Sequence, residues 1–395
     1  MAISLSQLCA NSEEKYSMRL MAGSAGLENS VRWVHIVEDS EVPDFLHGNE
    51  LIFTTGIGHS GNEWLIDFTS SLKERGAVGL IVNIGPYISA VPPQVIVFCE
   101  QNSFPLFTIP WTTRIIDMSY DFCRSIIANE KRENTIADSF RAIIRSPDSV
   151  KEYLPVFTKS GFGENSRYTI ISIMVEKGGF PATQTVVRNT DMVLWKTLKH
   201  SKFHSTIFMN EGALTAVRQN CTDGDIYSFC ELLKPIAENN DDVKIYIGVS
   251  ETAEGLGKIS YAYSQSRAAL LTSRINGKEP IFYRDIGMMK LICAVGDRRI
   301  LKEFADEYIG ALEKYDAEKN SGYSETLKIY LQKNGSVNAV AEETGVHRNT
   351  VNGKIKNIRK MLGVELNAED RSMLMLAYLI KDVLDIYNKD GGNLL

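Results

Sequence analysis

The sequence has little of what marks secreted, metal-binding or membrane proteins. Its 395 residues include six cysteines and no Cys-x-x-Cys pair, so neither a disulfide framework nor a zinc site is predicted. No apolar run reaches the roughly 18 residues that span a bilayer, and the first residues lack the basic start and apolar stretch of a signal peptide. We therefore expect a soluble, cytoplasmic protein that needs no cofactor and no metal.

The chain also lacks a strong charge of either sign. It carries 43 Lys and Arg against 49 Asp and Glu, which gives a net charge of -6. Any binding to nucleic acid must therefore come from a local basic patch rather than from the field of the whole protein. A length of 395 residues, 44% of them hydrophobic, is enough for two or three domains with separate cores.

A local basic patch does occur near the carboxyl end. Residues 337–362 predict two short helices, in which Ala341 fits where the helices cross and Gly345 supplies the positive φ of a tight turn. The second helix has an apolar stripe at helical spacing, formed by Val351, Ile355, Ile358 and Leu362. No Asp or Glu lies between His347 and Met361. This pattern predicts a helix-turn-helix unit.

The polar face of the second helix carries the residue types that read DNA. Lys and Arg neutralise phosphates, whereas Arg and Asn near the start of a helix reach base edges in the major groove. Base contacts are therefore predicted for Arg348, Asn349, Thr350 and Asn352. Phosphate contacts are predicted for Lys354, Lys356 and Arg359. The alternative interpretation is a solvated basic helix in a helical bundle.

Several short segments in this region form a recognisable combination. They are Thr326-Leu327, Tyr330-Leu331, Asn334-Gly335, Ala341, Val346-His347-Arg348-Asn349-Thr350-Val351, Ile358, Leu362-Gly363 and Glu369-Asp370-Arg371. The combination resembles the C-terminal helix-turn-helix of the PucR/CdaR class of bacterial transcription regulators. One segment departs from that class, because Asn352-Gly353-Lys354 stands where bulkier and more basic residues are usual. The base preference of relatives therefore cannot be copied to this chain.

The N-terminal region has a different pattern. Apolar, strand-like segments alternate with helical ones over residues 31–109, which implies a mainly parallel sheet covered by helices. Ligands of such sheets bind outside the carboxyl ends of the strands. The candidate ligand contacts are Glu38, Glu50, Thr54, Thr55, Gly56 and Asn83. Alternatively, Thr54-Thr55-Gly56 is an ordinary strand terminus and Glu38 caps a helix.

This N-terminal region is also similar to a known domain. The segments Val31 to His35, Gly48-x-Glu50-Leu51 and Thr54-Thr55-Gly56 resemble the effector domain of the PucR class. The resemblance implies a small-molecule effector, with purine-degradation intermediates such as allantoin-type ureides first, and other nitrogenous metabolites or sugar acids next.

Residues 112–145 read as a long helix. Its first apolar stripe contains Ile115, Met118, Phe122 and Ile126. Two roles are open for this stripe, since it can pair across a dimer as a short coiled coil or pack against its own domain.

The middle region follows the order β-α-β-β-α-β, which is ferredoxin-like. Ile247-Gly248-Val249-Ser250 and Tyr261-x-x-Ser264-x-x-Arg267-Ala268-Ala269-Leu270 resemble the degenerate GGDEF-like module of the same class. A cyclase needs carboxylates around two metal ions, but the hairpin at Glu211 offers one and the first strand none. We expect no enzymatic activity. His200 and His204 lie four residues apart without a third ligand nearby, so no metal site is expected.

The predicted fold class is multidomain α/β and all-α. It comprises an effector-sensing α/β domain (1–110), a helical linker (111–160), a degenerate GGDEF-like α+β domain (161–286), a helical connector (287–322) and a helix-turn-helix domain (323–395). The resemblance implies a ligand-responsive transcription regulator, an activator of a catabolic operon, that binds double-stranded DNA as a homodimer or larger homo-oligomer. The competing interpretation is a nucleotide-binding or cyclase-like signalling protein with a helical dimerisation tail.

Overall fold

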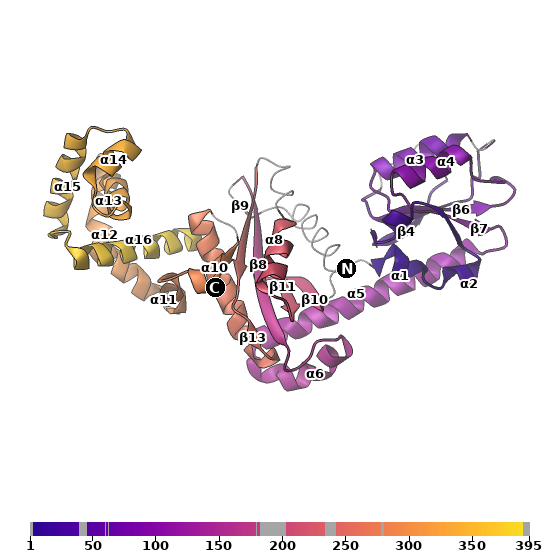
Figure 1. Cartoon of the computed structure of the whole chain (residues 1–395), viewed down its shortest axis with the longest axis horizontal. Helices are drawn as coiled ribbons and strands as arrows, with labels where there is room; N and C mark the ends of the chain where they lie inside the picture. The colour runs from indigo at the N-terminus through magenta and orange to yellow at the C-terminus, as the bar shows by residue number, and fades with distance from the viewer. Residues whose placement is uncertain are drawn as a thin grey trace. The chain divides into compact units, whose positions relative to one another are not determined.

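A computed structural model describes residues 3–38, 46–59, 61, 63–178, 180–181, 203–233, 242–277 and 280–389 (Figure 1). The chain divides into two compact units, built mainly from Met1–Ala142 and from Phe203–Leu395. None of the helices within the described ranges is long and apolar enough to cross a membrane.

The first unit is organised around a five-stranded sheet. The strands lie in the order β2 (Arg19–Ala22), β7 (Leu106–Pro110), β6 (Gly79–Ile84), β5 (Glu50–Thr54) and β4 (Trp33–Ile36). The four strands from β7 to β4 are parallel, and β2 pairs antiparallel with β7. The predicted mainly parallel sheet is therefore confirmed. A separate antiparallel pair is formed by β1 (Ile3–Ser4) and β3 (Ser30–Val31).

Helices cover both faces of this sheet (Figure 1). On one face, α3 (Trp64–Glu74) and α4 (Pro93–Gln101) pack with Ile52, Leu80 and Val82. On the other face, α1 (Leu5–Cys9) and the first half of α5 (Ile115–Arg145) pack with Leu51, Phe53 and Ile81. The alternation arises because successive side chains of a strand point to opposite faces. The short helix α2 (Ser12–Tyr16) precedes β2.

The long helix α5 packs against its own domain. Met118, Phe122 and Ile126 are at most 5% exposed and belong to the core beneath the sheet. Of the two roles left open for this stripe, the structure supports intradomain packing, so pairing of this stripe across a dimer is wrong. Near its end, Phe140 packs against Phe157 of α6 (Val150–Lys159), with ring centroids 4.7 Å apart and the ring planes tilted by 57°.

The second unit contains another sheet. Its main strands lie in the order β10 (Ser205–Asn210), β11 (Ala213–Gln219), β8 (Arg167–Lys177), β12 (Val243–Val249) and β14 (Ile281–Phe282). All neighbours are antiparallel except β12 and β14. Two short strands, β9 (Phe180–Pro181) and β13 (Ala253–Glu254), pair with β8. The helix predicted at 183–199 lies outside the described residues, as does His200.

Among the described residues, α8 (Asp223–Glu231) and α10 (Ile259–Asn276) accompany this sheet. Glycine at position 248 lets α10 approach β12 closely, because a Cβ there would lie 2.0 Å from the backbone nitrogen of Leu270. A buried hydrogen bond of 2.8 Å between the hydroxyls of Ser172 and Ser266 ties the same helix to β8.

The remaining helices are α11 (Met289–Ala294), α12 (Arg298–Lys319), α13 (Tyr323–Gln332), α14 (Val337–Thr344), α15 (Arg348–Leu362) and α16 (Ala368–Lys389). Ile309 and Leu312 of α12 share one core with the helices α13 to α16. The segment 287–322, predicted as a connector, thus contributes a helix to the core of the helix-turn-helix region. The end of α16, with Ile380 and Val383, packs instead in the core that contains α10.

Candidate nucleic-acid interface

The turn between α14 and α15 has the predicted helix-turn-helix geometry. Ser336 caps α14, since its hydroxyl accepts a 3.3 Å hydrogen bond from the N–H of Ala339. Gly345 ends α14 with φ +67°, and its N–H donates to the carbonyl of Ala341. A Cβ at Gly345 would meet nothing within 4 Å, so the backbone conformation rather than lack of space favours glycine.

Helix α15 is held by one apolar side and two caps. His347 precedes it, and its Nδ1 accepts a 3.3 Å hydrogen bond from the N–H of Asn349. Gly363 ends it with φ +67°. Three side chains of the predicted stripe are buried against the other helices: Val351, Ile355 and Ile358. Leu362 is partly buried at the edge of the same core.

The opposite side of α15 is exposed. The predicted base-reading residues Arg348, Asn349, Thr350 and Asn352 all lie in solvent at the start of the helix. A row at i, i+4, i+7 and i+11 is turned away from the core and consists of Asn349, Gly353, Lys356 and Lys360. Lys360 was not among the predicted DNA contacts, although its spacing from Lys356 is the signal that places it in this row.

The other two predicted phosphate contacts have partners inside the protein. Lys354 is half-buried, and its Nζ lies 3.4 Å from the hydroxyl of Thr326 on α13. Arg359 forms an ion pair with Glu365, just beyond the end of α15. The structure thus distinguishes three cations that the sequence presented as equivalent, because only Lys356 of the three projects from the outward row.

Charge on α15 is of one sign. The helix carries Arg348, Lys354, Lys356, Arg359 and Lys360 and no acidic residue. A chain with a net charge of -6 therefore has a concentrated positive surface at this helix.

Asp316, near the end of α12, fixes the start of α13. Its carboxylate accepts hydrogen bonds from the N–H groups of Tyr323 at 2.9 Å and Ser324 at 2.7 Å, and from the Ser321 hydroxyl. Burial alone would raise the pKa of the Asp316 carboxyl, but these hydrogen bonds and the charge of Lys354 outweigh it and lower the pKa. Asp316 thus joins α12, α13 and α15 electrostatically.

In the first unit, the structure brings four of the six predicted ligand contacts together. The carboxylate of Glu38 accepts hydrogen bonds from the N–H groups of Thr55 at 2.9 Å and Gly56 at 2.8 Å. It also accepts from the hydroxyls of Thr54 and Thr55 at 3.0 and 2.7 Å. The carboxylate and its donors therefore satisfy each other's hydrogen bonds within the protein, and the cluster fixes the loop that follows β5.

The other two predicted contacts are elsewhere. Glu50 begins β5, four residues of about 3.3 Å each from Thr54, so the expectation that it joins the carboxyl end of the strand is wrong. Asn83 lies near the carboxyl end of β6 and is 2% exposed. Its side chain shares the α5 side of the sheet with Ile81, because strand residues alternate between faces. Its Oδ1 has no hydrogen-bond partner among the described residues.

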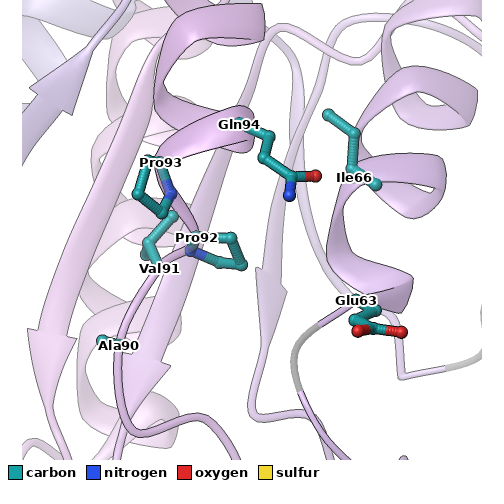
Figure 2. Close-up of a pocket in the computed structure, with 7 residues that line it drawn as sticks. All are labelled: Glu63, Ile66, Ala90, Val91, Pro92, Pro93 and Gln94. Atoms are coloured by element: carbon teal, nitrogen blue, oxygen red, sulfur yellow. The ribbon is translucent and has the colours of Figure 1, made fainter.

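A pocket of about 350 Å³ opens beside this edge of the sheet (Figure 2). Glu63 and Ile66 at the start of α3 form one wall, and Pro92, Pro93 and Gln94 at the start of α4 form the other, with Ala90 and Val91. None of the predicted ligand contacts lines it. His59 links the two places, since its Nε2 lies 2.7 Å from the carbonyl of Glu38 and its ring stacks on Trp64 beside Glu63.

The hairpin between β10 and β11 carries the carboxylate of Glu211, which is hydrogen-bonded within the protein. Tyr263 of α10 donates a 3.0 Å hydrogen bond to the carboxylate of Glu211, and Arg267 donates to the carbonyl of the same residue at 3.2 Å. Burial raises the pKa of Tyr263 to about 12. Among the described residues, no three His, Cys, Asp or Glu side chains converge as a metal site requires.

Comparison with known proteins assigns both ends of the chain. Residues 7–126 match the purine catabolism regulatory protein-like family, and residues 323–380 match the PucR C-terminal helix-turn-helix domain. Three curated relatives come from Bacillus subtilis (strain 168). The proline-responsive transcriptional activator PutR is 26% identical over 126 residues, which cover 31% of either chain.

The purine catabolism regulatory protein is 30% identical over 25% of this chain and 19% of its own length. The DNA-binding transcriptional activator AdeR is 22% identical over 32% of this chain and 30% of its own length. The aligned regions therefore span less than a third of each relative. A solved regulator of polyketide synthase expression from Bifidobacterium adolescentis aligns at 16% identity and a TM-score of 0.28, covering 59% of this chain and 92% of that chain.

Proposed function

We propose that this chain, which carries the N-terminal and helix-turn-helix domains of the PucR family of transcription regulators, is itself a DNA-binding transcription regulator. The observation that carries the proposal is α15, a helix without acidic residues whose polar side is exposed while its apolar side is anchored in a core. Such a helix fits the major groove, where its first residues contact base edges.

In this proposal, Arg348, Asn349, Thr350 and Asn352 read bases, because they are exposed at the start of α15. Lys356 and Lys360 contact phosphates from the outward row. Lys354 and Arg359 add positive charge, but their partners Thr326 and Glu365 restrain them. Two copies of the chain engage a two-fold operator whose half-sites are separated by whole turns of about 34 Å.

The proposed signal is a small nitrogenous metabolite that binds the N-terminal domain. The names of the relatives support this class, since one is a purine catabolism regulator and another is proline-responsive. Purine-degradation intermediates are the first candidates. The pocket offers the carboxylate of Glu63 and the amide of Gln94 between apolar walls, which suits a compact molecule with N–H and C=O groups. The effector must favour one of two arrangements of the protein to act as a switch.

The middle domain is proposed to be a degenerate GGDEF-like module that relays this signal without catalysis. The use of Glu211 by Tyr263 and Arg267 supports the proposal, because this carboxylate is not directed at a metal-bound nucleotide. Incubation with GTP and Mg²⁺ is expected to give no turnover. Turnover that disappears in Glu211→Ala would favour the cyclase-like alternative instead.

The proposed function is tested by selecting bound duplexes from random DNA, with and without a panel of purine-degradation intermediates and amino acids. An enriched inverted repeat, with enrichment that changes for one metabolite, is the expected result. The matched control is Arg348→Ala, which should lose part of the enriched sequence while it still binds DNA. Absence of any enriched sequence under all conditions would contradict the proposal.

A further inference from the structure

A second apolar stripe runs along α5, on a side that the core does not cover. Ile116, Tyr120 and Ile127 are 70%, 68% and 47% exposed. With the partly buried Cys123, they follow the spacing i, i+4, i+7 and i+11 of a single helix face. This stripe differs from the buried one that contains Met118 and Phe122. Large apolar side chains at such regular spacing mark an interaction surface.

Two opposite charges flank this stripe on one side. Asp117 and Arg124 are seven residues, or about two turns, apart and both are exposed. Neither forms an ion pair within the described part of the chain. The nearby Asp121 is paired with Lys15, and the charge of Arg124 acts on Asp121 only at longer range. The flank therefore presents a negative and then a positive charge along the helix.

We propose that this stripe joins two copies of the chain through an antiparallel, two-fold pair of α5 helices. In a two-fold contact, residue i meets residue j and residue j meets residue i. Centring the pair between Tyr120 and Cys123 places Ile116 against the Ile127 of the second copy. The same centring places Asp117 beside the Arg124 of the second copy. By symmetry, the Arg124 of the first copy then lies beside the Asp117 of the second, so two ion pairs form.

An antiparallel pair is required by the position of the charges. Both lie on the same flank of the stripe, and equal flanks of two identical helices meet only when the helices run in opposite directions. In a parallel pair, this flank would face the opposite flank, which carries Ser119 and the buried Ile126. The sequence of the helix is thus complementary to itself, which favours a second copy over an unrelated partner.

Sedimentation equilibrium of the full chain without DNA tests this surface. Ile116→Glu is expected to raise the dimer dissociation constant at least about tenfold, because it buries a charge in the apolar stripe. Leu291→Glu is the matched control, since Leu291 is 74% exposed on α11 and lies outside the stripe. This control should leave the dissociation constant unchanged. A monomeric native chain, or equal effects of both variants, would overturn the proposal.

Charge reversal tests the direction of the helices. Asp117→Arg and Arg124→Asp should each weaken the dimer by placing like charges together, and the double variant should restore it. Failure of the double variant to restore the dimer would overturn the antiparallel arrangement. Because these measurements contain no DNA, loss of operator binding with an intact dimer would count against the proposed function alone.

Discussion

Residues on the exposed side of α15 differ in what they contribute to the proposed contact with DNA. Arg348 lies at the first turn, where a side chain reaches base edges, whereas Lys356 lies two turns later, where a cation meets phosphates. Arg348→Ala is therefore expected to cost about 1–3 kcal/mol on the operator and to relax specificity at one base pair. Lys356→Ala should weaken binding to all sequences and lower the salt slope by about one.

Titration of both variants against operator and random duplexes at several salt concentrations checks these roles. The native chain is measured in parallel. Equal losses on operator and random DNA for both variants would contradict the assignment of Arg348 to bases and Lys356 to phosphates.

Gly353, in the outward row of α15, lowers the stability of this helix. It lies inside α15, and a Cβ there would meet nothing within 4 Å. Gly353→Ala should stabilise the helix by about 0.5–1 kcal/mol through reduced backbone freedom. Slower hydrogen exchange of the α15 amides in the free protein would show this effect. Gly363→Ala is the control. It should destabilise the end of the helix, because φ at Gly363 is +67° and alanine adopts this conformation only with strain. Faster exchange in Gly353→Ala would contradict the expectation.

The lowered pKa of Asp316 implies that the stability of the folded chain depends on pH. Its pKa in the folded chain is below the ordinary value of 3.8, so its stabilising effect is present above that value and disappears as the pH falls through the lowered pKa. Asp316→Ala removes the carboxylate acceptors and should cost about 0.5–2 kcal/mol at neutral pH, as loss of a helix cap does. Thermal unfolding of the variant at pH 7 and pH 3 checks this, since the difference from the native chain should shrink at pH 3. A constant difference would contradict the role of the charge.

The candidate ligand contacts also show how much of the site could be predicted from the sequence. Glu38, Thr54, Thr55 and Gly56 were predicted together and do lie together, because they follow neighbouring parallel strands. Glu50 was misplaced, because it directly precedes the apolar segment that begins at Leu51 and therefore lies at the amino end of β5. The pocket residues Glu63 and Gln94 were missed because their proximity depends on how α3 and α4 pack, which no local pattern records.

At the scale of elements, apolar periodicity was the strongest guide. It predicted α15 and its buried side, because Val351, Ile355 and Ile358 repeat with the period of a helix. It left the packing of α5 undecided, since a stripe has the same spacing whether a sheet or a second chain covers it. The sequence also did not predict that α12 contributes to the core around α13 and α15. Ile309 and Leu312 are apolar residues of a helix, and nothing in the sequence shows which other helices they contact.

Over the whole of the second unit, α16 connects the core beside the sheet to the core of the helix-turn-helix region. One end of α16 packs with α13 and α15, through Leu374 and Ala377, and the other packs with α10, through Ile380 and Val383. We therefore expect a displacement of α10 to be passed along one continuous helix to the core beneath α15. We expect an effector that acts on DNA binding to change the exchange of amides in α16 as well.

In the proposed complex, α15 occupies the major groove of the operator. Dimethyl sulfate footprinting of the selected operator tests it most directly, because the reagent methylates guanine N7 in the major groove and adenine N3 in the minor groove. We expect protection of guanines in two half-sites, lost at one position in Arg348→Ala. Protection of adenines alone, or a guanine pattern that Arg348→Ala leaves unchanged, would contradict it.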